Sequence, residues 1–89
     1  MSAQSQLLDS AFLSKKKLYT SIHEALKEPE KVYRLALVDE YLDELPSRIS
    51  ELSSLQYLDV SQNKLTALPT DICDLPNLQY IKARNNQIE

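Results

Sequence analysis

Glycine is absent from this chain of 89 residues, and histidine and cysteine occur once each. Without glycine the chain lacks the loops that bring a backbone close to nucleotide phosphates. His23 and Cys73 alone cannot supply the several nitrogen and sulfur ligands that a zinc site needs. We therefore expect no metal ion, no cofactor and no enzymatic activity.

An excess of positive charge is also absent. The formal net charge is −3 and the isoelectric point is about 5.1, whereas a general nucleic-acid-binding protein carries a basic stripe, so we expect no nucleic-acid partner. The only basic run is Lys15–Lys17. We interpret it as a solvated helix surface. A less favoured alternative is contact with an acidic partner or with lipid headgroups, since three charges anchor a protein weakly.

Long hydrophobic runs are missing too. The N-terminal residues lack a basic segment followed by an apolar stretch, so no signal peptide is predicted, and no stretch reaches the length of a membrane span. As the sole cysteine, Cys73 cannot form an internal disulfide. These features together favour a reducing, cytoplasmic location.

The side chains that often carry chemistry have plainer interpretations here. His23 is interpreted as a surface or cap residue of a predicted helix, with proton transfer or pH sensing as the alternative. Cys73 is equivalent to Ser50, and we expect it to fill a turn, because a reactive thiol would need a basic neighbour. An acidic cluster comprises Asp39, Glu40, Asp43 and Glu44. We expect a solvated, partner-steering edge there, since its spacing does not match a calcium-binding loop.

What the chain does contain is a repeat of period 23. The first, second and third units begin at Val32, Leu55 and Leu78. Equivalent residues further along the units are Leu42, Leu65 and Ile88; Leu45 and Leu68; Pro46 and Pro69; Ile49 and Ile72; Leu52 and Leu75; and Asn63 and Asn86, where the first unit has Glu40. A fixed period of this length predicts stacked coils that present an extended surface.

These units resemble the leucine-rich repeat family, of the kind Leu-x-x-Leu-x-Leu-x-x-Asn-x-Leu-x-x-Leu-Pro-x-x-Ile-x-x-Leu, and Leu55–Leu75 fits without a gap. The resemblance covers about residues 32–89 and looks closest to intracellular Ras-group and Scribble-like proteins and to bacterial members. It implies an α/β solenoid with a short parallel sheet on its concave side, an irregular or 3₁₀ convex side, and a ladder of asparagines. Because an ionised Glu40 only accepts hydrogen bonds, we expect the first unit to depend on its cap as much as on that ladder.

Within a unit, the alternation of apolar and polar residues predicts a short strand. In residues 57–61 this pattern turns Leu58 and Val60 inward and the other side chains outward. Leu68 precedes a proline, which favours an extended start to the convex side. The spacing of Ile72, Leu75 and Leu78 predicts one or two turns of irregular or 3₁₀-like helix that pack inward.

Residues 1–31 do not follow the repeat and have a helical pattern. One apolar face comprises Leu7, Leu8, Ala11 and Phe12 and is continued loosely by Leu18, Tyr19, Ile22, Ala25 and Leu26. Ser21 with Glu24 is typical of a capping box, so a second helix is predicted to start there and to end before Pro29. We expect residues 1–31 to form a helical segment and cap over the first repeat, and residues 32–89 to form two complete repeats and a partial third.

The outward residues of the strands are the best candidates for a binding surface. They are Arg34, Ala36 and Val38; Tyr57, Asp59 and Ser61; and Tyr80, Lys82 and Arg84. Equivalent residues lie on neighbouring strands, so stacking predicts that Tyr57 and Tyr80 pair beside Arg34. Tyrosine and arginine are also favoured anchors at protein interfaces. The alternative is that the tyrosines repeat only because the units duplicated, and that Asp59 and Lys82 neutralise one another.

Two functions fit the sequence. The favoured one is a non-catalytic interaction module, for which the family resemblance implies a protein or peptide partner. The alternative is the substrate-recruiting or regulatory N-terminal part of a larger signalling enzyme such as a kinase, a GTPase or a ubiquitin ligase. The third unit stops soon after Ile88, so we expect its end to be covered by a continuing array, by self-association or by a partner.

Overall fold

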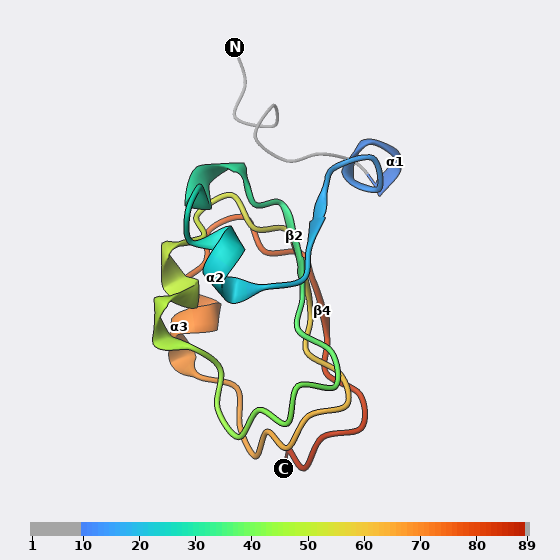
Figure 1. The fold of residues 1–89 in the computed structure, drawn as a ribbon, viewed down its shortest axis with the longest axis vertical. Coiled ribbons are helices and arrows are strands. Elements are labelled where there is room, and N and C mark those ends of the chain that lie inside the picture. The colour runs from blue at the N-terminus through green and yellow to red at the C-terminus, as the bar shows by residue number, and fades with distance from the viewer. Residues whose placement is uncertain (1–9, 89) are drawn as a thin grey trace.

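The structure, a computed structural model that describes residues 10–88, is built around one parallel sheet. Its strands are β1 (Leu18–Tyr19), β2 (Arg34–Ala36), β3 (Tyr57–Asp59) and β4 (Tyr80–Lys82), and they lie in chain order. The helical turns α2 (Ile22–Ala25) and α3 (Thr70–Cys73) lie on the opposite side of the molecule from the sheet (Figure 1). Each unit therefore runs out along a strand and returns over a helical turn, as in the predicted solenoid.

The strands are stacked in the register that the period of 23 predicts. Arg34 is paired with Tyr57, and Tyr57 is paired with Tyr80. Since residues one period apart occupy neighbouring strands, every inward side chain lies above its equivalent. Leu35, Leu58 and Ile81 form one such row through the sheet.

The predicted inward side chains form the core between the sheet and the helical turns. Leu35, Leu58 and Val60 are fully buried, and Leu37 is 1% exposed. The third unit differs, because Ile81 is 42% exposed and Ala83 is only partly buried. The expectation that the last inward row lacks cover is confirmed for the residues that the structure describes.

A buried asparagine joins the first unit to the second. The Asn63 side-chain oxygen accepts hydrogen bonds from the backbone N–H groups of Glu40 (2.9 Å) and Leu42 (3.1 Å). Its side-chain nitrogen donates to the carbonyl oxygens of Leu37 (2.7 Å) and Val60 (2.9 Å). Both functions of one amide are thus used on two coils at once, as expected for the ladder.

The ladder also explains why Glu40 is tolerated. Asn86 repeats the pattern one unit later, since its oxygen accepts from the backbone N–H of Leu65 at 3.0 Å and its nitrogen donates to the carbonyl of Val60 at 3.0 Å. Each asparagine therefore serves the unit before its own. The ladder bonds of the first unit come from Asn63 and so do not depend on Glu40, whereas the expectation that this unit depends on its cap as much as on the ladder stays a prediction.

The turns that follow the strands adopt the left-handed conformation without glycine. Asp39, Gln62 and Asn85 lie one period apart and have φ values of 59°, 61° and 59°. Asparagine and aspartate tolerate this region better than most residues do. Tyr41 also has a positive φ, of 58°, although the structure gives no such angle to its equivalents in the other units. The first turn therefore differs from the other two at the unit that lacks the ladder asparagine.

The convex side consists of single turns whose apolar residues face the core. The first unit has the 3₁₀ helix η3 (Ser47–Glu51), of the predicted type. The second unit forms the α-helical turn α3 instead, so the 3₁₀-like interpretation is wrong there. Ile72 and Leu75 are nevertheless 3% and 6% exposed, which confirms that they pack inward.

The N-terminal segment is less helical than its pattern predicted. After α1 (Ser10–Leu13), Leu18 and Tyr19 form strand β1 and pair in parallel with β2, so the predicted continuation of the helix through them is wrong. The pairing satisfies backbone groups along one edge of β2 that a helix would leave open. Leu7 and Leu8 lie outside the described residues.

The second predicted helix is present but short. Ser21 caps it, since its hydroxyl oxygen accepts from the backbone N–H of Glu24 at 3.3 Å, as the capping box predicts. The helix α2 ends at Ala25, and the 3₁₀ helix η2 (Pro29–Lys31) follows. Tyr19 and Ala25 are buried with Leu35 in one core, so this part of the chain packs against the first repeat, and its role as a cap stays a prediction.

A short hydrogen bond joins strand β1 to the residue that precedes η2. The Tyr19 hydroxyl donates to the Glu28 carboxylate at 2.6 Å. The bond to Glu28 raises the pKa of the Tyr19 phenol, and the bond from Tyr19 lowers the pKa of the Glu28 carboxyl. The contact therefore depends on a neutral phenol and an ionised carboxylate at the same time.

We predict that replacing Asn63 with alanine lowers the free energy of unfolding by about 2–4 kcal/mol, because buried backbone groups of two units lose their partners. Urea denaturation followed by circular dichroism measures this change. Asn86→Ala is the matched control, since Asn86 is only partly buried at the open end and its loss costs about 1 kcal/mol. Equal losses for the two variants would contradict the assignment of Asn63 as the main tie.

We also predict that stability falls at both ends of the pH range. A lowered pKa for Glu28 stabilises the fold above the ordinary carboxyl pKa, and this contribution is lost as pH falls through the folded value. A raised pKa for Tyr19 stabilises the fold below the ordinary phenol pKa, and this contribution is lost as pH rises through the folded value. Urea midpoints across pH measure both losses. Tyr19→Phe flattens them, and an unchanged profile for this variant would refute the coupling.

Candidate functional site

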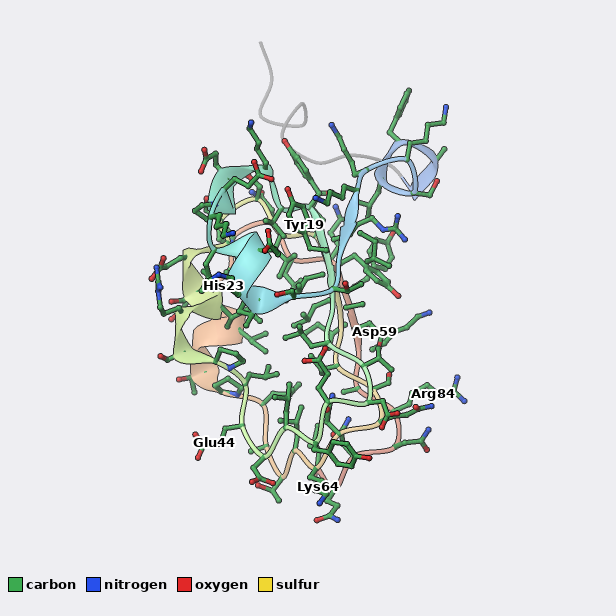
Figure 2. The ribbon with its side chains drawn as sticks, viewed as in Figure 1. Tyr19, His23, Glu44, Asp59, Lys64 and Arg84 are labelled. Atoms are coloured by element: carbon green, nitrogen blue, oxygen red, sulfur yellow. The ribbon has the colours of Figure 1, made fainter. Side chains whose placement is uncertain are left out.

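The outward residues of β2, β3 and β4, with the positions just beyond them, form one surface that we call the concave face. Its members are Arg34, Ala36, Val38, Tyr57, Asp59, Ser61, Tyr80, Lys82 and Arg84. Figure 2 shows Asp59 and Arg84 on the strand side of the molecule, opposite His23 on α2. The structure thus brings together all seven partner-binding candidates predicted from the sequence.

Tyr57 lies at the centre of this face between two cations. The guanidinium carbon of Arg34 is 5.6 Å from the centroid of the Tyr57 ring, and the ammonium nitrogen of Lys82 is 5.8 Å from it. Both distances allow a cation–π attraction. Tyr80 is the register neighbour of Tyr57 on the other side and is 44% exposed. The predicted adjacency of the tyrosines and Arg34 is therefore confirmed.

Asp59 and Lys82 are also register neighbours, but they do not form an ion pair among the described side chains. The Asp59 carboxylate accepts from the backbone N–H of Ser61 at 3.0 Å and so completes its own turn. Lys82 is placed over Tyr57 instead. The alternative, in which these two neighbouring charges neutralise one another, therefore does not take the form of an ion pair and stays open.

Ser61 and Arg84 continue the face beyond the strands. The Ser61 hydroxyl oxygen accepts from the backbone N–H of Arg84 at 3.2 Å and so joins the second unit to the third. The bond is made by the backbone of Arg84 and does not involve its guanidinium, and the residue is exposed. A hydrogen bond between the coils therefore fixes the backbone that carries this third cation.

Arg34 has a second role that the sequence did not reveal. One terminal nitrogen of its guanidinium donates to the carbonyl oxygens of Ser14 and Lys16, each at 3.1 Å. The bonds hold the segment after α1 against the edge of the concave face. The pattern of period 23 contains no signal for this contact, because its acceptors are backbone groups outside the repeats.

The result is a groove of about 500 Å³ between the N-terminal segment and the sheet. Its walls include Leu13, Ser14, Arg34, Tyr57, Tyr80 and Lys82. Leu13 is only 4% exposed and lines the groove together with the tyrosine side chains. A concave site with apolar sides and a few polar groups is the usual form of a binding site.

The basic run Lys15–Lys17 directly follows Ser14 of the groove wall and lies outside the helix predicted for it. Lys15–Lys17 follows α1, so the run is not part of a helix surface. Lys15, Lys16 and Lys17 lie over the rings of Phe12, Tyr33 and Tyr19, at 5.8, 4.8 and 4.5 Å from the centroids. Each of these three charges therefore lies near an aromatic ring.

Other candidate chemistry does not gather at the concave face. His23 is exposed on α2, and the side chain of Cys73 lies outside what the structure describes. The acidic cluster is exposed at all four positions, Asp39, Glu40, Asp43 and Glu44. Within residues 10–88 the structure holds no group of three or more histidine, cysteine, aspartate or glutamate residues arranged to bind a metal ion.

No helix in the described part of the chain has the length and apolar character needed to cross a lipid bilayer.

Comparison with known proteins identifies the repeat. The model of the family described as "Leucine rich repeat" matches residues 30–88, which is more than half of the chain. A leucine-rich repeat protein of Leptospira interrogans has a similar solved structure, with 30% sequence identity and a TM-score of 0.58. The match covers 79% of this chain and 24% of that one, so this chain spans about a quarter of its structural neighbour. No curated protein matches it. The chain belongs to the leucine-rich repeat family.

Proposed function

We propose that the concave face is a non-catalytic interaction surface that binds a protein or peptide partner. The observation that carries the proposal is the row of Arg34, Tyr57 and Tyr80, held in register across three strands. Tyrosine and arginine are the residue types most enriched among interface anchors, together with tryptophan. Here they line a groove together with Leu13.

The rigidity of the face supports this proposal. Tyr57 and Tyr80 lie on neighbouring paired strands, and Asn63 ties the second coil to the first. Side chains that are already held in place lose less conformational entropy when a partner binds. The two cations over Tyr57 restrict its ring further. The face is therefore suited to binding without rearrangement.

Family membership supports the same class of function, because stacked repeats generate extended concave surfaces that serve in binding. The alternative, in which the repeats recruit substrates for a larger signalling enzyme, is supported by no observation on residues 10–88. In this alternative the binding face is the same, but the bound partner is a substrate that is brought to a catalytic domain.

We predict that Tyr57→Ala combined with Tyr80→Ala weakens partner binding by on the order of 100-fold, since two interface anchors contribute about 1–2 kcal/mol each. The partner is captured from native cell extract with the wild-type chain, identified by mass spectrometry, purified and titrated by calorimetry. Tyr41→Ala is the matched control, because Tyr41 is 74% exposed and lies outside the concave face.

Circular dichroism and urea midpoints must show that both the double variant and Tyr41→Ala fold like the wild type. The expected result is a loss of affinity in the double variant and wild-type affinity in Tyr41→Ala. Wild-type affinity in a folded double variant would place the binding surface elsewhere, on the convex side or on the N-terminal segment.

A further inference from the structure

The concave face has the opposite charge to the chain as a whole. The chain has a formal net charge of −3, whereas the face contains the cations Arg34, Lys82 and Arg84 and the single anion Asp59. We propose that the groove beside Tyr57 selects an acidic polypeptide segment that carries an apolar side chain next to a carboxylate. The inference rests on the proposed function and names the partner chemistry that the face accepts.

The cations of the face form no ion pair with the carboxylates of residues 10–88. The ion pairs that the structure gives for residues 10–88 join Lys27 to Glu24, Lys31 to Glu28 and Arg48 to Glu51, and all lie outside the concave face. The Asp59 carboxylate is turned to its own backbone. A carboxylate from a partner therefore meets cations that form no ion pair with a carboxylate of residues 10–88.

Arg34 is prepared to bind such a carboxylate. One terminal nitrogen is occupied by the carbonyls of Ser14 and Lys16, which fixes the plane of the guanidinium. The other terminal nitrogen and Nε retain N–H donors, and that edge of a guanidinium binds a carboxylate with two parallel hydrogen bonds. Because the side chain is already held, little entropy remains to be lost on binding.

Lys82 supplies the second cation of the groove. Its ammonium group and the Arg34 guanidinium lie over the same Tyr57 ring, at 5.8 and 5.6 Å from its centroid. A carboxylate placed near the ring is therefore attracted by both charges. Lys15–Lys17 starts one residue beyond Ser14 of the groove wall and adds to the positive field that draws an acidic segment.

The apolar part of the groove specifies the neighbouring side chain. Leu13, Tyr57, Tyr80 and Ile81 line it, and Tyr80 and Ile81 are 44% and 42% exposed. An apolar side chain of the ligand removes this exposed apolar surface from water, which a purely charged ligand does not do. The groove therefore favours an acidic polypeptide with an apolar residue over a polymer that offers only negative charge.

The test is a selection of phage-displayed random dodecapeptides on the wild-type chain. We expect the selected peptides to be enriched in aspartate or glutamate beside leucine, isoleucine or phenylalanine. A synthetic peptide from the selection is then compared by fluorescence anisotropy with the same peptide carrying asparagine or glutamine for the acids. We expect the amide version to bind at least tenfold more weakly, and the difference to shrink as salt rises.

Lys82→Gln tests whether Lys82 causes the preference for acidic over amide peptides, and Lys64→Gln is the matched control. Lys64 also lies over a tyrosine ring, 5.5 Å from the centroid of Tyr41, but is outside the concave face. We expect the preference for acids to fall at least fivefold in Lys82→Gln and to persist in Lys64→Gln. Both side chains are exposed, so both variants are expected to fold, and circular dichroism checks this.

Three results would overturn the inference: selection of neutral or basic peptides, equal binding of the acid and amide versions, or an unchanged preference in Lys82→Gln. Each leaves the proposed function standing if the double tyrosine variant still loses its partner. A single-stranded oligothymidylate that binds more tightly than the peptide, and depends on Lys82, would also overturn the inference in favour of a nucleic-acid ligand. Partner binding that ignores both tyrosines refutes the proposed function itself.

Discussion

The side chain of Asn63 is the contact on which the stacking of the units depends. Its amide oxygen accepts from two N–H groups of the first unit, and its nitrogen donates to carbonyls of the first and second units. Such a set of bonds fits only one separation and one register of the two coils, because every donor and acceptor has a fixed direction. The buried rows through Leu35 and Leu58 follow from that register.

The same register builds the functional surface on the other side of the strands. A strand that turns Leu58 inward must turn Tyr57 and Asp59 outward, so the core and the concave face are set by one constraint. Tyr57 reaches Arg34 and Lys82 only because both lie on strands next to its own. A shift by one residue between the coils would bury the polar row and expose the leucines.

The sequence predicted the inward and outward positions that the repeat of period 23 determines. The inward positions of Leu58 and Val60 and the outward neighbours Tyr57 and Tyr80 follow from counting in steps of 23 and of two. Strand β1 was missed, because two residues carry no periodicity of their own and pair only where β2 offers an edge. The bonds from Arg34 to Ser14 and Lys16 were also missed, because a backbone acceptor has no sequence signature.

Arg34 links the cap and the concave face, so the two parts of the chain are not independent. Its guanidinium holds the segment that carries Leu13, and Leu13 in turn forms the apolar wall of the groove. Loss of this side chain removes a charge and also releases the wall, so its effect on binding combines two causes. For the side chain of Lys82, in contrast, the structure gives an interaction with the Tyr57 ring and no hydrogen bond or ion pair within residues 10–88. Lys82 is therefore the residue at which the charge of the groove acts separately from its shape.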